Sequence, residues 1–189
     1  EGLLVHELMH AIQDQHTDLG SLTDRKFGND RIIAAQAAIE GQATLVMLEF
    51  MAKQTTGVAV DLGQVSDFAS QMRPLLEETR SQFPVLASSP RVIRESLLFP
   101  YLEGVNFVQS LWLQAGRVAP FGERLPISTE QVLLKSTAEE PIKVEVEVRG
   151  AQVVKEDVLG QLVVGIMVEE HLGAETEPLT EGWEGDRYV

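Results

Sequence analysis

The chain has 189 residues, 44% of them hydrophobic, so it can bury a real core as one domain. Its 15 Lys and Arg stand against 29 Asp and Glu, which gives a formal net charge of −14. Such a surface repels phosphate backbones and argues against nucleic-acid binding. The chain has no cysteine, which excludes disulfides, thiolate catalysis and Cys-type zinc sites. No apolar run is long enough to suggest a transmembrane segment.

The first motif is an HExxH pattern at positions 6–10. The run around it lacks proline and is rich in helix-forming residues, which predicts a helix over residues 2–16. On a helix His6 and His10 face the same way, about 6 Å apart along the axis, so both imidazoles can reach one ion. Glu7 is placed to accept a proton from a water whose pKa zinc would lower. The pattern therefore predicts a zinc hydrolase; the alternative is an amphipathic helix with two histidines on its polar face.

A second helix is expected over residues 31–54, with Asp30 as its N-cap. This segment is apolar on nearly every side, which predicts that it is buried, yet Glu40 lies in its middle. A buried carboxylate without a partner is costly, so Glu40 should be paired with a cation. The Ala and Gly residues beside it would let the two helices approach closely. Glu40 is thus a candidate third zinc ligand; the alternatives are a side chain that reaches solvent or one that binds a core arginine.

His16 is the competing third ligand, because it lies at the spacing of the metzincin signature HExxHxxGxxH. That signature needs a glycine to break the helix, and Gln13 stands at this position. If the helix continues, the sixth residue after His10 lies about 240° around and about 9 Å along, which is out of reach. Glu40 is therefore the favoured third ligand. His16 is better explained as a residue of the last helical turn or as a support for the ligands.

The rest of the chain is predicted to be mostly helical, with one pair of strands. Residues 142–149 alternate apolar and charged side chains, which indicates a strand, and 152–155 would be its partner after a turn at Gly150. We therefore expect one mainly α (α+β) domain over residues 1–189, with a small β-hairpin near 142–155. Because the sequence starts at Glu1 inside the first helix, without Met, an upstream segment is also expected. Four further helices are expected over about 61–82, 89–99, 102–115 and 157–171. A short helix is also expected after a capping box at 128–131.

The segment HELMHAIQDQH, followed by IEGQATLVM, resembles the gluzincin side of the zincin metallopeptidases. It resembles more closely a largely uncharacterised family of bacterial HExxH proteins, whose pattern this chain matches over residues 6–16, 40–44, 128–131 and 182–187. The resemblance implies a zincin-like fold in which the HExxH helix packs on a second buried helix. It also implies one zinc ion, a peptide or protein substrate, and the site residues His6, His10 and Glu40 as ligands with Glu7 as general base.

Hydrolysis of a peptide bond also needs a donor that stabilises the oxyanion. The sequence offers several candidates without choosing among them: Tyr101, His171, Asp186, Arg187 and Tyr188. Two functions of other classes also remain open. One is a zincin-like protein that binds metal without activity and serves as an interaction module. The other is a helical interaction domain without metal, in which Glu40 pairs with an arginine.

Overall fold

The computed structural model describes residues 1–64, 67–78, 82–145, 147, 149–150, 152–173, 180–181 and 183. This described part is mainly helical, and none of its helices is long and apolar enough to cross a membrane. The helices are α1 (Gly2–His16), α2 (Leu19–Leu22), α3 (Asn29–Thr56), α4 (Phe68–Glu78), α5 (Pro84–Ser88), α6 (Arg91–Ala115), α7 (Thr129–Leu134) and α8 (Gly160–Leu172). Short 3-10 turns are η1 (Arg25–Phe27), η2 (Leu62–Gln64) and η4 (Gly122–Arg124).

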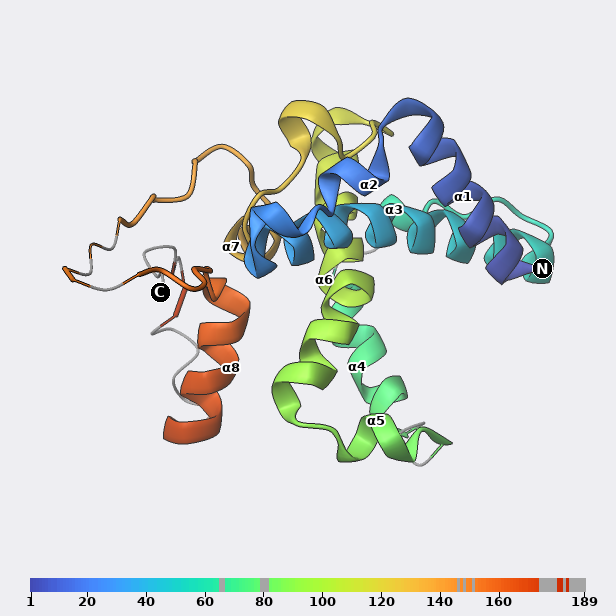
Figure 1. Cartoon of the computed structure of the whole chain (residues 1–189). Coiled ribbons are helices and arrows are strands. Elements are labelled where there is room, and N and C mark those ends of the chain that lie inside the picture. Colours follow the sequence, from blue (N-terminus) through green and yellow to red (C-terminus); the bar gives the residue numbers. More distant parts are fainter. Residues whose placement is uncertain are drawn as a thin grey trace.

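Two long helices, α3 and α6, cross at the centre of the molecule (Figure 1). A Cβ atom on Gly41 would lie 2.2 Å from the carbonyl oxygen of Gly104, and one on Gly104 would lie 2.3 Å from the carbonyl oxygen of Ala37. The two backbones can touch only because both crossing positions are glycine. The small residues beside Glu40 therefore do allow a close approach, but the helix that approaches at Gly41 is α6 rather than the HExxH helix.

Helix α6 runs without interruption from Arg91 to Ala115 and contains Pro100 in its interior. The prediction of two separate helices over 89–99 and 102–115 was therefore wrong. Proline lacks a backbone donor and costs about 3 kcal/mol inside a helix. Pro100 is buried together with Phe99 and Leu102, whose side chains are only 2% and 3% exposed. Burial of these apolar groups against the core offsets the cost, which a local reading of the sequence cannot weigh.

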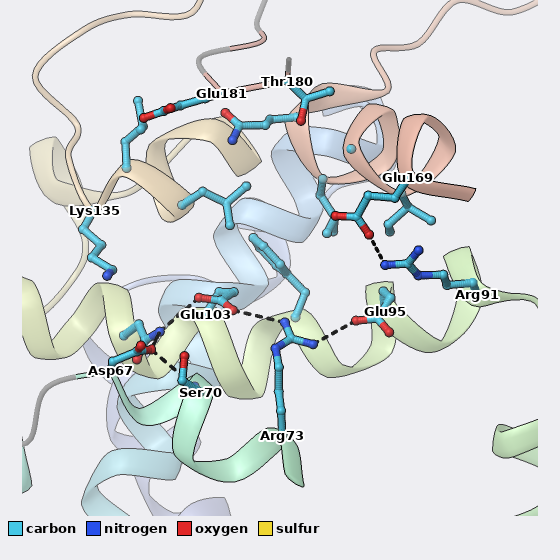
Figure 2. A pocket seen from close by; sticks show the side chains of 18 residues that line it. Asp67, Ser70, Arg73, Arg91, Glu95, Glu103, Lys135, Glu169, Thr180 and Glu181 are labelled. Carbon is cyan, nitrogen blue, oxygen red and sulfur yellow. Dashed lines mark hydrogen bonds and ion pairs between the residues drawn. The ribbon is translucent and has the colours of Figure 1, made fainter. Parts of the chain in front are cut away.

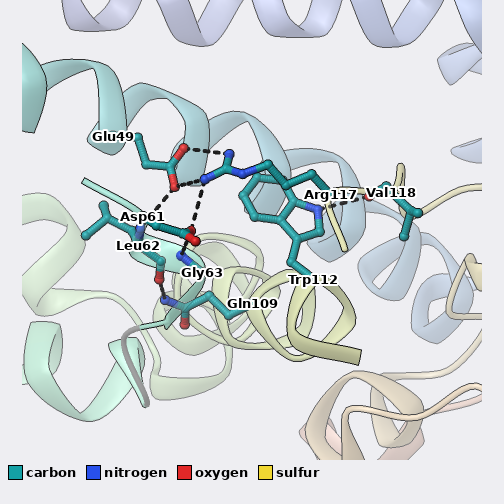
Figure 3. Close-up of polar contacts among 8 residues, drawn as sticks. All are labelled: Glu49, Asp61, Leu62, Gly63, Gln109, Trp112, Arg117 and Val118. Carbon is teal, nitrogen blue, oxygen red and sulfur yellow. Dashed lines mark hydrogen bonds and ion pairs between the residues drawn. The ribbon is translucent and has the colours of Figure 1, made fainter. Parts of the chain in front are cut away.

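A second contact joins α3 to α6 near their C-terminal ends (Figure 3). Arg117 donates to both carboxylate oxygens of Glu49, at 2.8 and 2.6 Å, and to Asp61 at 3.0 Å. Its guanidinium also lies 4.6 Å from the ring centroid of Trp112, whose indole nitrogen donates to the carbonyl of Val118 at 2.9 Å. A bidentate arginine pair fixes geometry as well as charge. The glycine contact and the Arg117 ion pairs therefore fix the crossing of α3 and α6 at two separate points.

The N-terminus of α3 is tied to distant segments by two buried aspartates. The Asp30 carboxylate accepts from the backbone nitrogen of Thr129 at 3.2 Å and from its hydroxyl at 2.5 Å. Asp157 accepts from the backbone nitrogen of Asn29 at 2.8 Å. Asp30 is therefore not the N-cap that the sequence predicted, because Gly28 occupies that position. A side chain from the far end of the chain caps the helix instead, which local sequence rules cannot anticipate.

The N-cap bond of the capping box predicted at 128–131 is present at the start of α7, whereas the reciprocal side-chain bond goes to Ile127 rather than to Ser128. The hydroxyl of Ser128 accepts from the backbone nitrogen of Gln131 at 3.2 Å, and both residues are buried. The side chain of Gln131 reaches back instead of a Glu and accepts from the backbone nitrogen of Ile127 at 2.7 Å. These local bonds satisfy donors that an uncapped helix would leave unpaired. The sequence therefore located the start of this helix correctly.

The β-hairpin expected near residues 142–155 is not found in the described part of the chain. The described residues of this stretch form no strand, and residues 146, 148 and 151 lie outside the description. Ile142 and Val154 are 63% and 96% exposed, so these two apolar residues, one from each expected strand, do not face a core. An isolated two-stranded hairpin is at best marginally stable in water. The described structure is therefore mainly α, and the small β part that the sequence predicted is not confirmed.

Candidate metal centre

The two histidines of the HExxH motif lie on one face of α1, which spans Gly2–His16 as the sequence predicted. This face packs on α3, the second buried helix of the prediction (Figure 1). The Nε2 atoms of His6 and His10 are 3.0 Å apart. One carboxylate oxygen of Glu40 lies 3.1 Å from Nε2 of His6 and 3.4 Å from Nε2 of His10. The structure thus brings together the three residues that were expected to bind zinc.

The three side chains have the right size and chemistry for a zinc site. Two imidazole nitrogens and one carboxylate oxygen lie within 4.8 Å of one another. A tetrahedral zinc ion with bonds of about 2.0–2.1 Å holds its ligand atoms about 3.3–3.4 Å apart. The observed separations of 3.0, 3.1 and 3.4 Å are close to this spacing. If these three side chains held a zinc ion, a fourth position would be left open, as in catalytic zinc sites.

Glu7 is exposed and does not belong to the group of converging ligand atoms. It follows His6 directly in α1, so its side chain lies about 100° around the helix from that ligand. Its charge nevertheless acts on the hydroxyl of Tyr101, which lies beside the ligands. A carboxylate next to the ligands, but not among them, remains free to accept a proton.

Tyr101 reaches the site from α6. Its ring is stacked on that of His6, with centroids 6.4 Å apart, and its hydroxyl lies close enough to the Glu40 carboxylate to be affected by its charge. Burial raises the pKa of the Tyr101 hydroxyl above its usual value of about 10, and the negative charges of Glu40 and Glu7 raise it further. The hydroxyl therefore stays protonated and able to donate at neutral pH. Of the proposed oxyanion donors within the described residues, Tyr101 and not His171 lies beside the ligands.

Gln13 is a site residue that the sequence analysis considered only as a replacement for glycine. Its side chain is 2% exposed, and its carbonyl oxygen lies 2.8 Å from Nδ1 of His10. Its amide nitrogen donates to the backbone carbonyl of Ile39 at 3.0 Å and to the side-chain oxygen of Gln42 at 2.9 Å. The spacing of Gln13 from the two histidines could have indicated this role from the sequence. Gln13 lies three residues after His10, on the helical face that also carries both histidines.

His6 is held differently from His10. Its Nδ1 atom is buried without a hydrogen-bond partner among the described residues. The hydroxyl of Thr44, one turn after Glu40 on α3, is likewise buried and unpaired within the described structure. His6 is therefore oriented through its Nε2 contact with Glu40 and by stacking on Tyr101, whereas the Nδ1 atom of His10 has a hydrogen-bond partner of its own in Gln13.

The remaining predicted candidates lie away from the ligands or outside the description. α1 continues unbroken to His16, which is exposed and is not part of the ligand group. His171 lies in the last turn of α8, far from α1 (Figure 1). Asp186, Arg187 and Tyr188 lie outside the described residues, so their predicted roles stay predictions.

A cavity of about 810 Å³ lies elsewhere in the molecule, between α4, α6, α7 and α8 (Figure 2). Its charged walls are largely paired with one another: Arg73 contacts Glu95 at 3.1 Å and Glu103 at 3.2 Å, while Arg91 pairs with Glu169. None of the three zinc-ligand candidates lines this cavity. We therefore place the candidate site at the convergence of α1, α3 and α6 rather than in this cavity.

Comparisons with known proteins do not assign the chain to a family. No family model matches the sequence, and neither a curated protein nor a solved structure matches it.

Proposed function

We propose that this protein is a zinc-dependent metallopeptidase with His6, His10 and Glu40 as the metal ligands. The observation that carries the proposal is the convergence of these three ligand atoms within 4.8 Å, while the neighbouring Glu7 stays outside the group. When bound, zinc would supply Lewis acidity, polarising a substrate carbonyl and lowering the pKa of the attacking water. The metal-free alternative has less support, because the ion pairs of Glu40 in the described structure are with imidazoles and not with an arginine.

In this proposal Glu7 is the general base. It accepts a proton from the attacking water and passes it to the departing amine nitrogen, so that the carbon–nitrogen bond breaks without leaving an unstable anion. Its exposure leaves room for water and substrate beside it. The hydroxyl of Tyr101 is the proposed donor to the carbonyl oxygen of the substrate, which becomes negative in the transition state. To do this the hydroxyl turns from the neighbouring Glu40 carboxylate to the substrate.

The surface around Glu7 suits a peptide that carries apolar side chains. Leu3, Leu4 and Leu8 flank Glu7 on α1 and are 70%, 63% and 53% exposed. Exposed leucines this close to a candidate catalytic carboxylate can bury apolar side chains on either side of a scissile bond. We propose a peptide or protein substrate rather than a small polar molecule on this ground.

The decisive test is hydrolysis of a mixed library of peptides by the zinc-loaded chain, read out by mass spectrometry. The control is Glu7→Gln, which keeps all three ligands and removes the base. We expect new peptide termini with the parent chain, and a loss of rate of at least about 100-fold in Glu7→Gln at unchanged zinc content. Tyr101→Phe should lower kcat by about 100-fold without loss of zinc.

Zinc binding with no cleavage of any peptide would favour the inactive interaction module. Cleavage that survives Glu7→Gln at full rate would show a contaminating peptidase and would refute the assigned base.

A further inference from the structure

The amide group of Gln13 can adopt only one orientation in its buried position. One end of this amide lies 3.0 Å from the backbone carbonyl oxygen of Ile39, which can only accept a hydrogen bond. The nitrogen must therefore point toward Ile39, because the reverse orientation would bring two unprotonated oxygens together. The carbonyl oxygen of Gln13 then necessarily faces His10, at 2.8 Å from Nδ1.

This orientation determines which nitrogen of His10 carries the proton. An amide oxygen has no hydrogen to donate, so Nδ1 of His10 must be the donor in this bond. In a neutral imidazole the other nitrogen, Nε2, then bears the free lone pair. That atom lies 3.4 Å from the Glu40 carboxylate and 3.0 Å from Nε2 of His6. The lone pair of His10 is thus directed to the point where the other two ligand atoms converge.

The same amide also connects the two ligand-bearing helices. Ile39 precedes Glu40 directly in α3, so the carbonyl that holds Gln13 belongs to the peptide unit leading into the third ligand. A second acceptor on α3, the side-chain oxygen of Gln42, lies 2.9 Å from the Gln13 nitrogen. One side chain that is 2% exposed therefore contacts His10 through its oxygen and the backbone before Glu40 through its nitrogen.

We propose that Gln13 is a positioning residue of the metal site, which holds His10 in the Nδ1–H tautomer before any metal binds and fixes the position of α1 relative to Glu40. This inference rests on the proposed metal site but not on peptidase activity. A ligand held in its binding tautomer loses less freedom when the ion arrives, which raises affinity.

The first test uses the unaltered chain without metal. Long-range 1H–15N NMR of the imidazoles, recorded in chelator at about pH 8 where free imidazole is neutral, distinguishes the two tautomers. The His10 signals are identified from their disappearance in His10→Ala. We expect His10 to be predominantly the Nδ1–H tautomer. A predominantly Nε2–H ring, or the roughly free mixture of a solvent-exposed histidine, would overturn the proposal.

The second test compares Gln13→Met with Gln15→Met. Both replace a glutamine of α1 by an apolar side chain of similar length, but Gln15 is exposed. We expect Gln13→Met to weaken zinc binding by about 10–100-fold and to lose the Nδ1–H preference of His10. Gln15→Met should change neither, and equal affinities in the two variants would contradict the proposal.

A third variant distinguishes positioning from general stability. Gln13→Glu keeps an oxygen acceptor for His10 but removes the donor to Ile39, so it should lower stability while retaining the Nδ1–H tautomer. Circular dichroism and thermal unfolding show whether each variant is folded. Loss of the tautomer in a folded Gln13→Glu chain would refute the role of the oxygen. A chain that binds zinc tightly, passes these tests and cleaves no peptide would refute the proposed activity alone.

Discussion

Gly41 and Gly104 meet where α3 crosses α6, so closely that a Cβ on Gly41 would lie 2.2 Å from the carbonyl group of Gly104. Glu40 precedes Gly41 in α3, and Tyr101 lies one turn before Gly104 in α6. The crossing therefore determines how near the Tyr101 hydroxyl comes to the Glu40 carboxylate, whose charge acts on it. Two residues without side chains thus set the geometry of two residues whose side chains form the site.

Gly104→Ala should destabilise the protein strongly. The new methyl group would lie 2.3 Å from the backbone carbonyl oxygen of Ala37, and a backbone atom cannot rotate away. We expect a loss of at least about 2 kcal/mol in the free energy of unfolding, measured with urea. Gly165→Ala in α8 is the matched control, because its nearest neighbour would be the hydroxyl of Thr180 at 3.5 Å. That change should be neutral or stabilising by up to about 1 kcal/mol, and equal losses in both variants would contradict the crossing argument.

Zinc content should distinguish Glu40 from His16 as the third ligand. After chelation and re-addition of zinc, the parent chain and His16→Ala are expected to retain about one ion, because three ligands remain and α1 runs unbroken to His16. Glu40→Ala and His10→Ala should each lose it. The measurement is metal analysis by mass spectrometry on gel-filtered protein. Loss of zinc in His16→Ala alone would mean that the helix breaks near Gln13 when metal binds.

Tyr101 should ionise unusually late in the metal-free protein. Burial raises the pKa of its hydroxyl, and the charges of Glu40 and Glu7 add to this effect. Because the folded-state pKa is raised, the stabilisation is fully present below about pH 10, the ordinary value for tyrosine, and is lost as the pH rises through the higher folded-state value. Absorbance of tyrosinate at alkaline pH, compared between the parent and Tyr101→Phe, should show a late phase that only the parent has. Loss of an ordinary phase near pH 10 would contradict this prediction.

Thr129→Val should be costly although it changes few atoms. The Thr129 side chain is fully buried; its hydroxyl donates to Asp30 at 2.5 Å and accepts from the backbone nitrogen of Leu162 at 3.1 Å. Valine can neither donate to Asp30 nor accept from Leu162, so we expect a loss of about 2 kcal/mol in the free energy of unfolding. Thr55→Val, on the exposed end of α3, is the control and should change it by less than about 0.5 kcal/mol. Denaturation with urea measures both.

The elements predicted correctly were those with a strong local signal. The HExxH helix spans Gly2–His16 as predicted, and Ser128 caps the start of α7. Pro100 misled the prediction because a local rule treats proline as a helix breaker, whereas burial in the core overrides that rule. The strand expected over the alternating residues 142–149 is not confirmed: its described residues form no strand, and residues 146 and 148 lie outside the description.

The sequence by itself determined which chemical groups are available to the site. These are the imidazoles of His6 and His10, one helical turn apart, the Glu7 carboxylate between them in sequence, and Glu40 in the middle of an apolar helix. Helical periodicity alone places His6 and His10 together, because residues four apart share a face. Only the tertiary structure decided that Glu40 meets these histidines, that Tyr101 reaches them from α6, and that Gln13 joins His10 to the backbone before Glu40. Those contacts join residues 26 to 95 positions apart, and they depend on how two helices cross at a pair of glycines.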